Sequence, residues 1–147
     1  MDMRYAIFTK KFGKMLARAT SVRKVTSKLA GHLEPGTVSR VRLIEKNGLR
    51  VVDALREGTV LPASTLHDLT LLDRLLAEAE PEPFIWAMVQ RGKLDWRLVL
   101  GSLGWDPDEA SCSACQANSV AGFSVARQDF FCARCVVRIP RNELVTV

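Results

Sequence analysis

The chain of 147 residues lacks the motifs of the common enzyme classes. It has no glycine-rich phosphate loop, no G-x-S-x-G sequence and no H-E-x-x-H sequence, which excludes those phosphate-binding, serine-hydrolase and zinc-protease signatures. It has only two histidines, His32 in a basic connecting segment and His67 beside Asp68. We interpret the His67–Asp68 pair as surface or helix-cap chemistry, because no nucleophile pattern accompanies it. We therefore predict that the protein is not an enzyme.

Long apolar runs are also missing. No stretch approaches eighteen consecutive apolar residues, which excludes a membrane-spanning helix. The first fifteen residues carry five charges and no long apolar run, unlike a secretory signal. The apolar content of 48% is enough for a globular core. We expect a cytoplasmic protein without membrane contact, in a compartment where thiols stay reduced.

Acidic residues are absent from one long segment. Between Met3 and Leu33 there is no Asp or Glu, against eight Lys and Arg. Residues 1–60 carry a net charge of +8, whereas residues 61–147 carry −3. A block of one sign inside a foldable segment indicates a polyanionic partner, most simply nucleic acid. The alternative is a basic surface that only keeps the protein soluble.

All the cysteines of the chain lie in its last quarter. Cys112, Cys115, Cys132 and Cys135 form two C-x-x-C pairs separated by sixteen residues. This spacing predicts one tetrahedral zinc held by four thiolates, a saturated site that is structural rather than catalytic. The alternatives are two disulfides or four free thiols.

The first sixty residues alternate apolar and polar side chains with the period of two that is typical of strands. The expected strands are Arg4–Thr9, Lys14–Thr20, Thr37–Glu45 and Leu49–Arg56. Asn47-Gly48 is a strong hairpin signal between the last two. We therefore expect residues 1–60 to form a β domain.

The pattern then becomes helical. Leucines at helical spacing follow Thr65 as far as Ala79, and two shorter helices are expected over Phe84–Arg91 and Asp95–Leu103. Val136–Ile139 has the composition of a short strand. The fold class predicted from these elements is α+β, with a β domain over 1–60, a helical domain over 61–108 and a zinc-binding module with a C-terminal strand over 109–147.

Three segments of the chain resemble the bacterial RecO family of DNA repair and recombination mediators. The similar stretches are Phe8–Ala19 with Ser21–Lys24 and Ser27–Leu29, then Leu103–Pro107 with Cys112–Cys115, and finally Cys132–Cys135. The first resembles the family's LFT-x-x-x-GK-x-x-A-x-A-x-GVRK-x-x-SKL stretch. The second is similar to its LGY-x-P…C-x-x-C run, and the third to its second zinc knuckle.

The resemblance implies an N-terminal OB-fold barrel, a helical domain shorter than usual and a zinc knuckle holding one structural zinc. The family has about one more strand before its LFT segment, so we expect a partial barrel without its first strand. The implied function is a nucleoid-associated, non-catalytic mediator that binds and anneals DNA and assists recombinase loading in RecF-pathway repair. The implied partners are single- and double-stranded DNA, RecR and the acidic C-terminal tail of single-strand-binding protein, which docks on the helical domain.

The basic side chains of the β domain are the candidate phosphate contacts. They are Lys10, Lys11, Lys14, Arg18, Arg23, Lys24, Lys28, Arg40 and Arg42, and Arg50 extends the same track. Tyr5, Phe8 and Phe12 are the aromatics available for base stacking, with a role in the barrel core as the alternative. A function of a different class is a zinc-ribbon adaptor that acts through protein contacts, with incidental nucleic-acid binding.

Overall fold

The structure is a computed structural model that describes residues 2–20, 28–59 and 66–147. The chain divides into two compact units. The first comprises Met1–Leu69 and Leu76–Gly92, and the second comprises Thr70–Leu75 and Lys93–Val147. Within the described ranges, no helix is long and apolar enough to cross a membrane.

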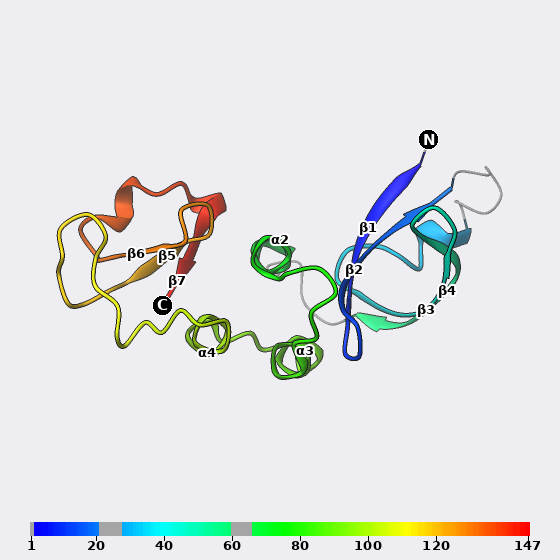
Figure 1. The fold of residues 1–147 in the computed structure, drawn as a ribbon, viewed down its shortest axis with the longest axis horizontal. Coiled ribbons are helices and arrows are strands. Elements are labelled where there is room, and N and C mark those ends of the chain that lie inside the picture. Colours follow the sequence, from blue (N-terminus) through cyan, green and yellow to red (C-terminus); the bar gives the residue numbers. More distant parts are fainter. Residues whose placement is uncertain (1, 21–27, 60–65) are drawn as a thin grey trace. The chain divides into compact units, whose positions relative to one another are not determined.

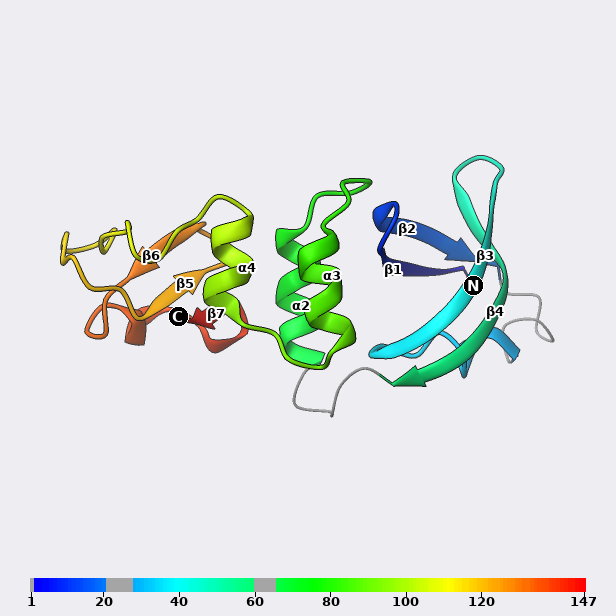
Figure 2. The same ribbon diagram turned by 90° about the horizontal axis from the view of Figure 1, so that it is seen from below.

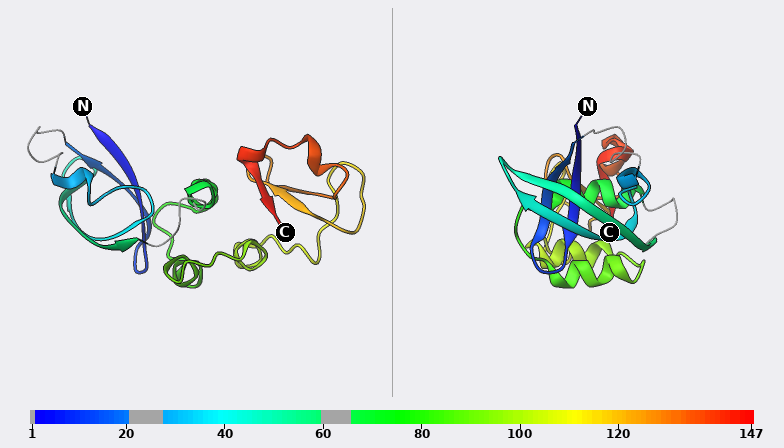
Figure 3. Two further views of the ribbon diagram at one scale, coloured as in Figure 1. Left: turned by 180° about the vertical axis from the view of Figure 1, so that it is seen from behind. Right: turned by 90° about the vertical axis from the view of Figure 1, so that its right-hand side faces the viewer.

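The first unit contains a four-stranded sheet, labelled in Figure 1. Its strands are β1 (Met3–Thr9), β2 (Gly13–Ala19), β3 (Thr37–Glu45) and β4 (Leu49–Thr59). The order across the sheet is β1-β2-β4-β3. The β1–β2 and β3–β4 pairs are antiparallel hairpins, whereas β2 and β4 run parallel. Figure 3 shows the long β3–β4 hairpin crossing the β1–β2 hairpin.

The core of this unit lies against one face of the sheet. Ala17 and Ala19 of β2 and Val51 of β4 are buried there with Leu29 and Leu33 of the connecting segment. Small alanines on the central strand let the connecting segment approach the sheet closely. The opposite face of β2 carries exposed side chains, because strand residues alternate between faces. One face of the sheet is therefore left for contacts outside the core.

The four strands predicted from the sequence are confirmed, with ends that differ by at most three residues. Asn47 and Gly48 both have positive φ, at 54° and 95°, as the hairpin signal requires. The β3–β4 register also contains irregularities between Val38 and Ser39 and between Arg42 and Leu43. Such bulges increase local twist, and the alternation of the sequence does not reveal them.

The three predicted helices are present; the first and third are shorter than expected, and the second has the expected length but begins one residue earlier. They are α2 (Leu66–Leu75), α3 (Pro83–Gln90) and α4 (Trp96–Ser102). Helix α3 has a proline in its first turn, and the side chain of Asp95 caps α4 by accepting hydrogen bonds from two backbone N–H groups. Helix α2 ends at Leu75, before Ala79, the predicted end of the helical pattern. The φ of Ala79 is 59°, which is not a value of a right-handed helix. Thr65 lies outside the described residues.

The second unit contains a three-stranded antiparallel sheet. Its strands are β5 (Gly122–Ser124), β6 (Asp129–Phe131) and β7 (Leu144–Thr146). Figure 2 shows β5 between the other two. The fully buried Phe123 of β5 packs on the Phe130 ring at 4.9 Å and on the Trp105 ring at 5.3 Å between centroids. The cysteine-bearing loops pack in a separate cluster of the same unit, where Cys112 and Cys132 are buried with Phe131 and Ile139.

The strand predicted over Val136–Ile139 is wrong. Residues Val136–Arg138 form a 3-10 helix, η2, followed by a second one, η3, over Arg141–Glu143. The Val136 N–H donates to the Cys132 carbonyl at 2.9 Å, so the turn of the second C-x-x-C pair continues into η2. The β-branched composition of the segment favoured a strand, but this turn overrides it. The strand of this region, β7, comes later.

Candidate metal centre and nucleic-acid interface

The four cysteines come together in the second unit. Their Sγ atoms all lie within 4.8 Å of one another. In the first pair, the Cys112 N–H donates to the Ala117 carbonyl and the Gln116 N–H donates to the Cys112 carbonyl, both at 2.8 Å. The Ser113 N–H donates to the Phe130 carbonyl at 2.9 Å, which holds this turn beside β6 and the second pair. The two turns therefore present their sulfurs to one point.

The cluster fits a single ion with tetrahedral sulfur ligands. The Sγ atoms of Cys115 and Cys132 are 3.6 Å apart. Zn–S bonds of about 2.3 Å in a regular tetrahedron give sulfur separations of about 3.8 Å. Cys112 and Cys132 are buried, while Cys115 is exposed and Cys135 is half-buried. The arrangement is compatible with a metal site at the edge of the module, and four sulfurs suit a soft or borderline metal rather than Ca²⁺ or Mg²⁺.

The protonation of the four thiols is unequal. Hydrogen bonding from the backbone N–H of Cys132 lowers the pKa of Cys112 to about 6. The backbone N–H of Cys135 likewise lowers the pKa of Cys132. A hydrogen bond with the Cys132 thiol is the main cause that raises the pKa of Cys135 to about 12. Two thiolates are thus favoured at the expense of their neighbours, and a bound cation is what would stabilise four together.

The described candidate phosphate contacts all belong to the first unit. Lys10 and Lys11 lie in the β1–β2 turn, Lys14 and Arg18 on β2, and Arg40 and Arg42 on β3, while Lys28 lies in a helical segment before β3. Arg23 and Lys24 lie outside the described residues, so their placement stays a prediction.

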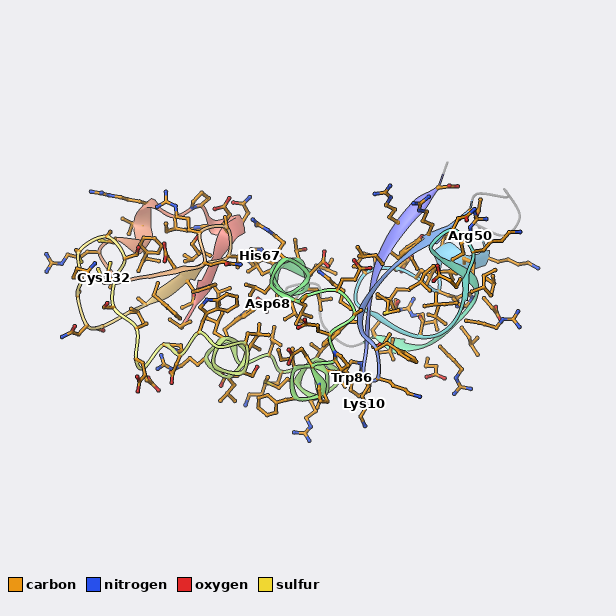
Figure 4. The ribbon with its side chains drawn as sticks, in the orientation of Figure 1. Lys10, Arg50, His67, Asp68, Trp86 and Cys132 are labelled. Carbon is orange, nitrogen blue, oxygen red and sulfur yellow. The ribbon has the colours of Figure 1, made fainter. Side chains whose placement is uncertain are left out.

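Three of these cations already contact groups of their own unit. The Lys10 Nζ lies 5.8 Å from the centroid of the Trp86 ring on α3, and Figure 4 shows the two residues side by side. The Lys11 Nζ lies 5.4 Å from the centroid of the Phe12 ring. Arg40 forms an ion pair of 2.8 Å with Glu57 of β4. These contacts are at the surface, where each contributes little to stability.

The register of the sheet aligns three arginines across neighbouring strands. Arg4 of β1 lies opposite Arg18 of β2, and Arg18 lies opposite Arg50 of β4. We call Arg4, Arg18 and Arg50 the arginine row. Sequence reasoning missed Arg4, because the charges become neighbours only through strand pairing. The parallel β2–β4 contact has no local signal in the sequence.

The aromatic candidates differ in exposure. Tyr5 of β1 is half-buried and packs against the core of the sheet. Phe8 follows on the opposite face, also half-buried, across from Lys14. Phe12, in the β1–β2 turn, is 55% exposed. Phe12 is therefore the one of the three candidates that is open to stacking on a base.

The negative charge of the chain is concentrated in its middle. Residues 61–109 hold nine Asp and Glu against four Lys and Arg, whereas residues 110–147 hold two against four. The value of −3 for residues 61–147 therefore averages an acidic helical segment and a mildly basic cysteine module. The basic residues 1–60 are therefore followed in the sequence by an acidic segment, residues 61–109.

Comparison with curated proteins finds similarity to a DNA repair protein. The chain is 28% identical over 172 residues to the DNA repair protein RecO of Myxococcus xanthus, and the match covers 99% of this chain and 70% of that protein. The similarity to a DNA repair protein is distant but spans nearly the whole chain. No protein-family model matches the chain. The relative supports the RecO-like resemblance of the sequence motifs.

Proposed function

We propose that this protein is a non-catalytic, DNA-binding mediator of repair and recombination that holds and anneals single strands. The observation that carries the proposal is the charge of residues 1–60, which we call the β unit. This segment holds thirteen Lys and Arg against five Asp and Glu. The similarity to a protein named for DNA repair, which spans 99% of this chain and 70% of that protein, supports it. Both observations indicate DNA as the partner, and neither requires a catalytic site.

The physical basis is neutralisation of phosphates. Lys and Arg side chains on the exposed face of the sheet replace condensed counterions along the nucleic-acid backbone, which makes affinity independent of sequence and sensitive to salt. Two strands held on one cationic surface repel each other less than in solution. Annealing then follows from base pairing between strands held close together, without a catalytic residue.

The β unit fits this role as a partial OB fold. The strand order β1-β2-β4-β3, with its parallel β2–β4 pair, is compatible with four strands of a five-stranded Greek-key barrel. Among the described strands, β1 and β3 are the two edges. OB folds bind oligonucleotides on an open sheet face, and the arginine row lies on the face opposite the core.

The cysteine cluster is proposed to hold one structural zinc. Cys112, Cys115, Cys132 and Cys135 would fill all four positions and leave none for substrate. The ion, when bound, supplies folding free energy to a module whose strands are only three residues long. These residues would fix the loops before β5 and after β6.

The partners of the proposal are DNA and, through the resemblance, a RecR-type protein. The resemblance also implies docking of an acidic tail on the helical segment. The excess of acidic residues over 61–109 disfavours that docking electrostatically. We therefore do not extend the proposal to single-strand-binding protein.

Strand annealing tests the proposal directly. Two complementary oligonucleotides, one carrying a fluorophore and the other a quencher, are mixed with and without the full chain at low salt. The proposal predicts faster pairing with protein, and loss of the effect at high salt as counterions compete for the phosphates. Unchanged pairing rates in protein shown to be folded would contradict the proposal and favour the adaptor function.

A further inference from the structure

The arginine row places three like charges next to one another on neighbouring strands, which destabilises the folded sheet. Side chains directly opposite on antiparallel strands have Cβ atoms about 4.5–5.5 Å apart, neighbouring strands of either kind lie about 4.8 Å apart, and like charges placed opposite each other at such distances are destabilising. Here Arg18 has an arginine as its opposite residue on both of its neighbouring strands. On the far side of Arg50, the opposite residue on β3 is the uncharged Ile44.

No Asp or Glu carboxylate in the described ranges forms an ion pair with an arginine of the row. Every Asp and Glu of the chain lies within residues 2–20, 28–59 and 66–147, and none of them forms an ion pair with Arg4, Arg18 or Arg50. By contrast, two other arginines of the same sheet, Arg40 and Arg56, have Glu57 and Glu34 as ion-pair partners. The first unit thus provides ion-pair partners for Arg40 and Arg56 and not for the three arginines of the row.

The row is also accessible. Arg4 and Arg18 are exposed and Arg50 is half-buried. Arg18 lies between the buried Ala17 and Ala19, so alternation places it on the face away from the core. Its backbone is held in the centre of the sheet, between β1 and β4. The three arginines therefore project from paired strands rather than from loops.

We propose that the arginine row is the central phosphate-binding track of the β unit, where successive phosphates of a single strand replace the missing carboxylates. Guanidinium groups bind phosphate oxygens with paired hydrogen bonds, and a polyanion relieves the mutual repulsion of the three charges. The inference rests on the proposed DNA-binding function and assigns it to three aligned residues, of which Arg4 is not among the candidates found from the sequence.

If the arginine row binds phosphates, a variant without its three charges should bind DNA less tightly and should also be more stable to heat. The substitutions Arg4→Gln, Arg18→Gln and Arg50→Gln are combined in the full chain. Binding of an oligothymidine of about 30 nucleotides is measured by fluorescence anisotropy over a series of salt concentrations, and Tm is measured on the same samples. The slope of log affinity against log salt should fall by about 2, since each single-strand phosphate contact contributes about 0.7. The Tm should rise by about 2–5 °C, because the repulsion is removed.

Two further variants separate the row from net charge and from misfolding. Lys93→Gln, Arg138→Gln and Arg141→Gln together remove the same charge from exposed positions outside the sheet, and should change the slope by less than about 0.5. Arg4→Lys, Arg18→Lys and Arg50→Lys together keep the charge and should keep most of the binding.

The outcomes separate failure of the proposed DNA-binding function from failure of the arginine row as its phosphate-binding track. A wild-type chain that binds no oligothymidine overturns the proposed function and the track with it. Wild-type binding that the glutamine variant of the row leaves unchanged in affinity and slope overturns the track alone. Equal losses in the row and control variants also overturn it, because they show an effect of net charge. A lower Tm for the row variant would show that the arginines serve the fold.

Discussion

The carbonyl oxygen of Lys14 accepts a hydrogen bond of 2.8 Å from the backbone N–H of Ala79. This bond joins the start of β2 to the segment that follows α2, within the first unit. Gly13, the residue before Lys14, has a φ of 70°, and a Cβ built on it would lie 2.1 Å from the Glu80 carbonyl oxygen. The β1–β2 turn, which carries Lys10 and Lys11, is thus held against residues 78–80 by backbone contacts.

Gly13→Ala should destabilise the first unit. The added methyl group would overlap the Glu80 backbone, and the positive φ disfavours any side chain. We expect a loss of more than about 1 kcal/mol in the free energy of unfolding, measured by urea denaturation.

Gly48→Ala is the matched control for that substitution. Gly48 also has a positive φ, at 95°, but a Cβ there would meet no atom within 4 Å. It should cost only the conformational penalty, about 1 kcal/mol. If the two variants lose the same stability, the contact between the β1–β2 turn and Glu80 contributes nothing.

Phe123→Ala should destabilise the second unit most strongly. Phe123 is fully buried and stacks with Phe130 and Trp105. Removing a buried aromatic ring from a core costs about 3–5 kcal/mol. Leu98→Ala, at a position that is 51% exposed, should cost less than about 1 kcal/mol. Thermal unfolding followed by tryptophan fluorescence measures both, and similar Tm values for the two variants would contradict the assigned core.

Purified protein should contain one zinc per chain. Elemental analysis of protein prepared under reducing conditions measures the ratio. Chelation should unfold the cysteine module and leave the β unit folded, because a structural metal contributes directly to the stability of its own loops. Hydrogen exchange should show lost protection over residues 112–135 and unchanged protection in β1 to β4.

Single substitutions define the ligands of that zinc. Cys112→Ser, Cys115→Ser, Cys132→Ser and Cys135→Ser should each abolish tight binding, whereas Ser113→Ala, within the first turn, should retain it. Zinc-free wild-type protein, or full zinc content in a serine variant, would rule out the four-cysteine site.

Charge reversal at Arg23, Lys24 and Lys28 tests the part of the predicted interface that the structure does not cover fully. Loss of three single-strand phosphate contacts should lower the salt slope by about 2. Arg97→Glu, at an arginine paired with Asp108 in the second unit, serves as the control. An unchanged slope in a folded triple variant would confine the interface to the sheet.

Local signals allowed much of the fold to be predicted from the sequence. The alternation of Thr37–Glu45 and the Asn47-Gly48 turn specify the β3–β4 hairpin through neighbouring residues alone. The C-x-x-C spacing predicted that Cys112 and Cys132 come together, because each pair forms its own turn and only sixteen residues separate the pairs.

Features that depend on long-range pairing could not be predicted in the same way. The arginine row needs the parallel contact between β2 and β4, which joins residues thirty-two positions apart. Val136–Arg138 has strand-forming residues, yet hydrogen bonds to Cys132 and Cys135 wind it into η2. In the first case a tertiary contact supplements local preference, and in the second the hydrogen-bonded turn of the cysteine pair overrides the strand preference of the residues that follow it.

The salt dependence of single-strand binding by the full chain tests the central claim most directly. Affinity for an oligothymidine is measured at a series of salt concentrations, and log affinity is plotted against log salt. Neutralisation of phosphates by four or more cations of the β unit predicts a slope of about −3 or steeper. Absence of binding at low salt, or a flat plot, would contradict the account and favour the alternative function of an adaptor that acts through protein contacts.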